Sequence, residues 1–230
     1  MGIGPHLVAY IDRCARASIA EVAGKRMLEL GNQRLRTADG QKTTGKAYFD
    51  RLGVTHTSFD LNGRDGAIAI DLGKPCTDDA WRNAFDIITN AGTTEHVEPH
   101  EAQYECFKNI HEWLKPGGVA VHMVPDADAL QQRGAWRGHC CNYYTHAFFE
   151  RLAEDSGYTL VQPNRILSLV CVGLKKDGDA PFACDRRTFL SGIKRVEGGR
   201  VYRGINDGSR LNRVLHMIGV KARQAVSSER

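Results

Sequence analysis

Apolar residues along the chain follow two spacings, which predict two kinds of element. Helices are expected where apolar residues recur every three to four positions before a Gly or Pro: residues 5–24, 45–53, 101–118 and 145–158. Strands are expected at the short apolar runs: 25–31, 55–63, 66–75, 85–92, 119–125, 159–167 and 168–176. The polar residues 32–45 are expected to form a loop, and residues 78–84 a short helix or turn.

Strands that alternate with helices predict a parallel α/β sheet with helices on both faces. The last two strands, 159–167 and 168–176, are close enough in sequence to pair as antiparallel neighbours. Several strands end on polar residues, among them Glu29, Asp60 and Asn90. Because ligands bind beyond the carboxyl ends of parallel strands, the sequence predicts a ligand site at this edge of the sheet.

The composition is typical of a globular protein, with 42% apolar and 25% charged residues. The longest apolar runs are too short to span a membrane, and the N-terminal residues lack the pattern of a signal peptide. The seven cysteines include no C-x-x-C pair, which favours reduced thiols and disfavours a zinc site. We therefore expect a cytoplasmic protein with no membrane contact and no metal.

The net charge of +4 is distributed unevenly along the chain. Residues 186–230 contain eleven Lys and Arg against three Asp and Glu, whereas residues 1–185 carry a small net negative charge. Such a basic segment is typical of an anionic partner or substrate, and more commonly of a solvated surface extension. We predict an N-terminal helical segment (1–24), a central domain (25–178) and a basic C-terminal extension (179–230).

Five segments, taken in order, carry a family resemblance. They are LELG (28–31), FDLNG (59–63), AIDLG (69–73), FDIITNAGTTEHV (85–97) and LKPGG (114–118). Together they resemble the class I S-adenosylmethionine-dependent methyltransferases, and residues 25–178 would form the methyltransferase domain. The resemblance implies a Rossmann-like seven-stranded sheet with six parallel strands and one antiparallel strand. It also implies S-adenosyl-L-methionine as cofactor and S-adenosyl-L-homocysteine as product.

The resemblance assigns cofactor-binding roles to the strand ends. Glu29 and Gly31 are expected beneath the methionine end of the cofactor, and Asp60 at the ribose hydroxyls. Asp71 and the backbone of Leu72 are expected at the adenine amino group. The remaining predicted cofactor contacts, of which the last two face the sulfonium, are Asn32, Leu61, Asn90 and Gly92.

One part of the sequence departs from the family pattern. The family carries ExGxGxG after the first strand, whereas this chain reads ELGNQRLRTADG, with Gln33 and Leu35 at the positions of the later glycines. The interval from Glu29 to Asp60 is 31 residues, which leaves room for an altered first helix. We expect Asn32 or Gln33 to contact the methionine carboxylate instead.

Two histidines are candidates for a catalytic base, because imidazole is the usual general base. His96 lies in the turn after the fourth strand, and His139 lies in the aromatic stretch 136–146. Both also have a structural interpretation, as residues that line a pocket or cover the core. The predicted substrate-binding residues are Thr94, Glu95, Trp136, Tyr143, Tyr144 and His146.

The expected function is methyl transfer to an oxygen or nitrogen atom of a small-molecule acceptor, with a sugar or other natural-product intermediate as first choice. Two alternatives stay open. One is an RNA or other nucleic-acid methyltransferase that uses the basic segment, and the other is a non-catalytic binding module of the same fold. A nicotinamide-dependent dehydrogenase is disfavoured, because no GxGxxG opens a helix after the first strand. Nothing in the sequence specifies an oligomeric state.

Overall fold

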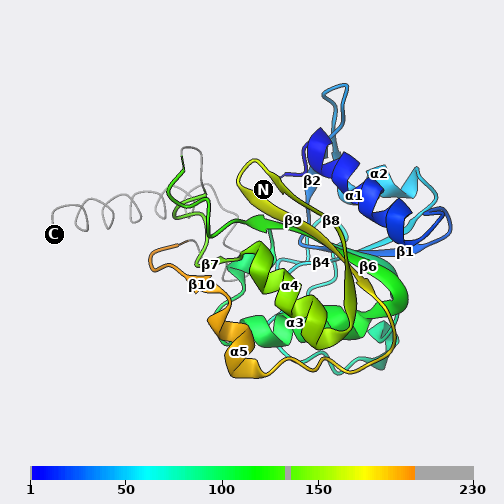
Figure 1. The fold of residues 1–230 in the computed structure, drawn as a ribbon. Helices are drawn as coiled ribbons and strands as arrows, with labels where there is room; N and C mark the ends of the chain where they lie inside the picture. The colour runs from blue at the N-terminus through cyan, green and yellow to red at the C-terminus, as the bar shows by residue number, and fades with distance from the viewer. Residues whose placement is uncertain (1, 133–135, 200–230) are drawn as a thin grey trace.

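The structure, a computed structural model that describes residues 2–132 and 136–199, is built on one central sheet. Six strands form it in the order β4-β1-β5-β6-β9-β8, with helices packed around the sheet (Figure 1). Their bounds are β1 Arg26–Leu30, β4 Thr55–Phe59, β5 Phe85–Ala91, β6 Leu114–Pro125, β8 Tyr158–Ile166 and β9 Leu169–Lys176. β4, β1, β5 and β6 run parallel, β9 is antiparallel to both neighbours, and β8 therefore points the same way as the first four. The expected α/β fold class and the antiparallel pairing of the last two strands are confirmed.

Within the described residues the sheet has one strand fewer than the seven expected. The segment 66–75, predicted as a strand, makes only a single parallel bridge, between Phe59 and Ile68. A parallel strand is normally covered on both faces, but Ile68 is 40% exposed and Ala69 is exposed as well. β4 is therefore the edge strand, and five strands share one direction instead of six.

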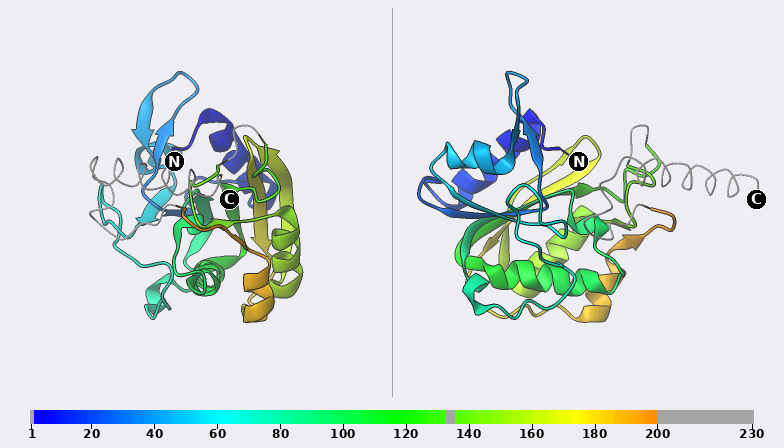
Figure 2. Two further views of the ribbon diagram at one scale, coloured as in Figure 1. Left: turned by 90° about the vertical axis from the view of Figure 1, so that its left-hand side faces the viewer. Right: turned by 180° about the vertical axis from the view of Figure 1, so that it is seen from behind.

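Two helices, α1 (Pro5–Ser18) and α2 (Gly45–Asp50), cover one face of the sheet (Figure 2). The buried side chains of α1 recur at helical spacing: Leu7, Tyr10, Ile11 and Cys14. The helix ends at Ser18, short of the expected Gly24, because the backbone of Ile19 is extended. The expected short helix after residue 45 is confirmed.

Three helices cover the other face: α3 (Ala102–Trp113), α4 (His146–Ser156) and α5 (Arg186–Ser191). Successive residues of a strand point to opposite faces, so Met27 of β1 packs on the α1 side and Leu28 on the α3 side. α5 belongs to the basic extension, yet its Phe189 is buried in the core under α3 and α4. The second apolar piece of that extension, residues 209–222, lies outside the described residues.

Residues 32–45, predicted as a loop, contain a β-hairpin. β2 (Arg34–Arg36) pairs antiparallel with β3 (Lys42–Thr44), and α2 follows directly. Leu35 anchors the hairpin, because it is fully buried and bridges to Ile3. The hairpin and α2 occupy the long interval between β1 and β4, where the sequence left room for an altered first helix.

Four short elements complete the described chain: η1 (Asp79–Trp81), η2 (Thr94–His96), β7 (Asn142–Tyr143) and β10 (Lys194–Arg195). η1 confirms the short helix or turn expected over residues 78–84. β10 pairs with β7, which ties the chain beyond α5 back to the segment after β6. Among the described residues, no helix is both long and apolar enough to cross a membrane.

Candidate functional site

The carboxyl ends of β4, β1 and β5 lie side by side at one edge of the sheet. Leu30, the last residue of β1, pairs with Phe59 of β4 on one side and with Asn90 of β5 on the other. The three segments that leave these strands therefore start next to one another, as the parallel arrangement predicts.

Gly31 leaves β1 in a conformation that suits only glycine. Its φ is +81°, and its N–H donates to the carbonyl of Phe59 at 2.7 Å. A Cβ at this position would lie 2.5 Å from Thr93 Oγ1 and 2.9 Å from Gln33 Nε2. The turn after β1 is thus packed directly against the turn after β5. The Thr93 hydroxyl and the Gln33 amide occupy the space over Gly31, so the position has no room for a side chain of its own.

Asp60 anchors the same turn from the neighbouring strand. Its Oδ2 accepts the backbone N–H of Asn32 at 2.8 Å, and its Oδ1 accepts that of Asn62 at 2.8 Å. A carboxylate has about four acceptor positions, so both oxygens retain capacity for further donors. Leu61, next in sequence, is 42% exposed.

Glu29 lies inside the protein on the α2 side of the sheet. It is 2% exposed, and its carboxylate lies so close to Gly45 that a Cβ there would be 2.4 Å from Oε1. Burial raises the pKa of this carboxyl, and His56, whose Nε2 lies 3.4 Å from Oε2, lowers it in part. The buried Glu29 carboxylate therefore packs against Gly45, the first residue of α2.

Asp71 and Leu72 lie in the exposed segment that follows β4. Asp71 is half-buried and accepts the N–H of Gly73 through Oδ1 at 3.1 Å. The Leu72 side chain is buried, and its carbonyl accepts Asn109 Nδ2 at 3.0 Å. A buried amide on α3 thus fixes the position of this segment.

The turn after β5 is held by the side chain of Asn90. Its Oδ1 accepts the N–H groups of Thr93 and Thr94, at 3.3 and 3.2 Å. Its Nδ2 contacts Thr94 Oγ1 at 2.8 Å and His122 Nδ1 at 3.0 Å. The Asn90 side chain is therefore engaged inside the protein, and the buried Gly92, with φ +77°, forms the bend.

Three potential metal ligands gather directly after this turn. Glu95 is fully buried, and its Oε1 lies 3.9 Å from His96 Nε2 and 3.8 Å from His139 Nε2. The two imidazole rings are 4.8 Å apart, centre to centre. Burial raises the pKa of Glu95 to about 8. Within the part of the chain that the structure describes, these three side chains lie close enough together to hold one metal ion. The sequence had given no expectation of a metal.

The profile of a protein family described as Methyltransferase domain matches residues 9–163 of the chain. The match covers more than half of the sequence and includes every strand end described above. The chain belongs to this methyltransferase family. It is an S-adenosylmethionine-dependent methyltransferase domain, and S-adenosylmethionine is its cofactor. No curated protein matches the sequence.

Several solved structures are similar to this chain in fold. A protein of Pyrococcus horikoshii matches with 14% identity and a TM-score of 0.52, over 74% of this chain and 89% of that one. A chain from the Haloferax volcanii complex of the Trm112 methyltransferase activator and a methyltransferase matches with 14% identity and a TM-score of 0.51, over 73% and 89%. A Burkholderia thailandensis 1,6-didemethyltoxoflavin N1-methyltransferase with bound S-adenosylhomocysteine matches with 17% identity and a TM-score of 0.49, over 73% and 78%.

The aromatic stretch 136–146 of the methyltransferase divides into two parts. The Trp136 ring lies 5.1 Å from that of His139, so both belong with the Glu95 cluster. Tyr143 and Tyr144 are fully buried and donate to the Trp136 carbonyl and to a buried glutamine, each at 2.7 Å. His146 begins α4, where its Nε2 lies 2.9 Å from the carbonyl of Asn164.

Two buried amides that the sequence did not single out brace this part of the methyltransferase. Gln103 donates to the carbonyls of Thr94 and Val97, both at 2.7 Å. Asn142 donates to the carbonyl of Glu95 at 3.2 Å and contacts the Glu98 carboxylate at 3.0 Å. In the sequence, the only signal for Gln103 is a polar residue on the buried side of α3, which is too common to identify its role.

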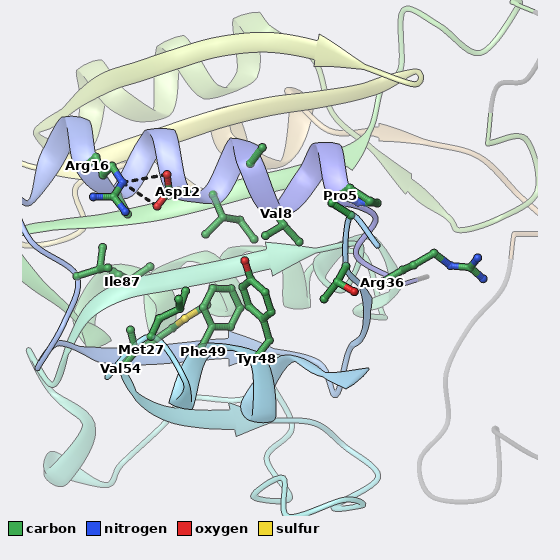
Figure 3. A pocket seen from close by; sticks show the side chains of 17 residues that line it. Pro5, Val8, Asp12, Arg16, Met27, Arg36, Tyr48, Phe49, Val54 and Ile87 are labelled. Carbon is green, nitrogen blue, oxygen red and sulfur yellow. Dashed lines mark hydrogen bonds and ion pairs between the residues drawn. The ribbon is translucent and has the colours of Figure 1, made fainter. Parts of the chain in front are cut away.

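A separate cavity of about 450 Å³ lies between α1 and α2 (Figure 3). Its walls are largely apolar and include Met27, Tyr48, Phe49 and Ile87. Met27 and Ile87 belong to the amino-terminal halves of β1 and β5, so the cavity is distinct from the site at the carboxyl ends.

Proposed function

We propose that this methyltransferase transfers a methyl group to an oxygen or nitrogen atom of a small-molecule acceptor, with a sugar or other natural-product intermediate as first choice. The observation that carries the proposal is the junction of Gly31, Asp60 and the Asn90 turn with the Glu95 cluster. A cofactor edge and a partly enclosed group of imidazoles thus lie next to one another, as a two-substrate transfer requires.

The cofactor half of the proposal rests on the strand ends. Bound S-adenosylmethionine supplies an electrophilic methyl group on a sulfonium. Asp60 would accept hydrogen bonds from the ribose hydroxyls at its remaining acceptor positions. The exposed Leu61 would pack on the adenine. Asp71 and the Leu72 backbone would reach the adenine amino group, from a segment that Asn109 already fixes.

The methionine end would lie at the turn of Gly31, beside the Thr93 and Gln33 side chains that pack over it. The Asn32 backbone and the buried Glu29 would shape this turn. Gly92 and the backbone of Asn90 would face the sulfonium.

The acceptor half rests on His139 and His96, with Trp136 as an apolar wall and Thr94 and Glu95 behind them. An acceptor hydroxyl or amine gives up a proton when it attacks the methyl carbon, so a neighbouring imidazole is a suitable base. A few convergent polar groups beside an aromatic side chain are typical of a small-molecule site. Tyr143, Tyr144 and His146 would support this wall indirectly, through their internal contacts.

The nucleic-acid alternative is weakened by how the described part of the basic extension is used. Arg195 pairs with Glu98 at 2.9 Å, and Arg186 lies 5.2 Å from the centre of the Tyr104 ring. Both charges are thus engaged within the domain.

All seven cysteines are free thiols, which supports a cytoplasmic location in this proposal.

The proposal is tested by following label from methyl-labelled S-adenosylmethionine into acceptor fractions. We expect label in the low-molecular-weight metabolite fraction of a cell extract and little in purified RNA, and at a cofactor concentration below saturation we expect much less label with Asp60→Asn. Circular dichroism would confirm that the variant is folded. Label that enters RNA and is lost at high salt would overturn the small-molecule assignment in favour of the nucleic-acid alternative. Cofactor binding without transfer to either fraction would favour a binding module.

A further inference from the structure

The Glu95 carboxylate is fully buried, and neither of its oxygens has a hydrogen-bond partner among the described residues. A buried carboxylate without compensation is strongly disfavoured, and such groups normally pair with a charge or coordinate a metal. Glu95 must therefore either stay protonated or face a cation.

The donor atoms around Glu95 have the geometry of an ion site. Nε2 of His96 and Nε2 of His139 lie 3.9 and 3.8 Å from the same oxygen, Oε1, and one ligand atom from each residue lies within 4.8 Å of the others. Ligands about 2.1 Å from one ion stand about 3.4 Å apart in a tetrahedral site. Displacements of about half an ångström per atom would bring all three donors to such distances.

The backbone under the cluster is fixed from two sides. Asn142 Nδ2 donates to the carbonyl of Glu95, and Gln103 Nε2 donates to that of Thr94. The Trp136 ring packs against His139 from the other side. Two of the three ligands are adjacent in sequence on η2, so only His139 must be brought from a distant segment. A site with this support is pre-organised rather than assembled on binding.

We propose that Glu95, His96 and His139 bind one divalent transition-metal ion. Two imidazoles and one carboxylate favour Zn²⁺, Co²⁺, Fe²⁺ or Mn²⁺ over Ca²⁺ and Mg²⁺, which prefer all-oxygen sites. Three protein ligands leave coordination positions open for another molecule. In this arrangement both histidines act as ligands and not as bases.

The cluster lies next to the cofactor edge. Thr93, two residues before Glu95, donates to the carbonyl of Leu30 at 2.7 Å, and its hydroxyl occupies the space over Gly31. An open position of the ion is thus available to an acceptor at the mouth of the proposed methyl-donor site. This part of the inference rests on the proposed function and narrows it to hydroxyl-bearing acceptors.

Coordination lowers the pKa of an acceptor hydroxyl, which then loses its proton to solvent. The oxygen forms the new bond to the methyl carbon while the carbon–sulfur bond breaks, and the electron pair of that bond stays on sulfur. No oxidant or reductant is needed.

The ion site is tested by titrating untagged, chelator-treated full-length protein with Co²⁺ and following the visible d–d absorption, with Zn²⁺ calorimetry as a second readout. We expect one equivalent to bind. Glu95→Gln, His96→Ala and His139→Ala should each weaken binding by roughly tenfold or more. The control His6→Ala removes an exposed histidine of α1 and should leave binding unchanged. Absence of binding, or binding that all three variants retain with circular dichroism unchanged, would overturn the site.

Calorimetry with S-adenosylhomocysteine on the same samples separates this inference from the proposed function. Cofactor binding without metal binding would refute the ion site and leave the methyltransferase proposal standing. Metal binding without cofactor binding would refute the proposed function and leave the ion site standing.

Once an acceptor is identified, a chelator should abolish transfer and Co²⁺ or Zn²⁺ should restore it. Transfer that a chelator leaves unchanged would refute the catalytic role of the ion.

Discussion

Acid should destabilise the methyltransferase through His122, a histidine in the middle of β6. The ring is fully buried and stacks on Phe107 with a centre-to-centre distance of 5.4 Å. Its Nδ1 accepts from the Asn90 amide at 3.0 Å, while Nε2 has no hydrogen-bond partner among the described residues. Burial lowers the pKa of His122 to about 3, so the ring stays neutral in the folded protein.

The sign and size of the effect follow from proton linkage. In the unfolded chain a histidine has a pKa of about 6.5. Below that pH the unfolded state binds a proton that the folded state cannot bind, so stability is lost as the pH falls from about 6.5 towards 3. Between pH 7.5 and 5.0 this single residue should lower the free energy of unfolding by about 2 kcal/mol. Over the whole window the loss approaches about 5 kcal/mol.

Urea denaturation at pH 7.5 and 5.0, on wild type and His122→Asn, measures the effect. An Asn at this position keeps an acceptor for Asn90 but does not titrate, and the cost of its smaller volume cancels between the two pH values. The variant should lose about 2 kcal/mol less than wild type on acidification, whatever the other histidines contribute. Equal losses in the two proteins would refute the assignment of His122 as a buried neutral ring.

Three further predictions concern the candidate site. Gly24→Ala should cost about 1 kcal/mol of unfolding free energy because its φ is positive, and Gly31→Ala should cost more, because its Cβ would also lie 2.5 Å from Thr93 Oγ1. Only Gly31→Ala should also weaken S-adenosylhomocysteine binding in calorimetry, since a Cβ at Gly24 meets nothing within 4 Å; equal affinities would contradict this. Asn142→Ala should lower the free energy of unfolding by about 2–4 kcal/mol in urea denaturation, because the carbonyls of Glu95 and Val97 lose their donor. A loss below about 1 kcal/mol would argue against the bracing role of Asn142. Tyr144→Phe should cost about 1–2 kcal/mol and leave cofactor affinity unchanged, whereas a specific loss of acceptor affinity would give Tyr144 a substrate role.

Most of the sheet was predictable because buried strands and amphipathic helices leave strong periodic signals. β5 matches its expected segment closely, and the short apolar runs at β8 and β9 did pair. α3 ends at Trp113, and residues 114–118, which were expected at the end of this helix, instead begin β6. The hairpin of residues 34–44 was missed because each strand contains three residues, too few for a pattern to emerge. The segment 66–75 was wrongly predicted as a strand because its apolar run makes only one bridge to β4, with Ile68 and Ala69 exposed in its middle.

The cofactor edge was predictable for a topological reason, whereas the metal-ligand cluster was not. Polar residues that follow parallel strands must meet at one edge, so the proximity of Gly31 and Asp60 follows from the order of elements. His139 comes from a different segment than Glu95 and His96, and no sequence spacing connects them. The roles of the predicted site residues stay predictions until binding and transfer are measured.

The central claim is that the edge formed by Gly31 and Asp60 binds S-adenosylmethionine. Calorimetric titration of wild type and Asp60→Asn with S-adenosylmethionine and S-adenosylhomocysteine tests it directly. Both compounds should bind wild type with roughly micromolar dissociation constants, and Asp60→Asn should weaken both by roughly ten- to a hundredfold, since hydrogen bonds to a charged acceptor are each worth about 1.5–3 kcal/mol. Folded wild-type protein that binds neither compound, or a folded Asp60→Asn variant that binds both as tightly as wild type, would contradict the account.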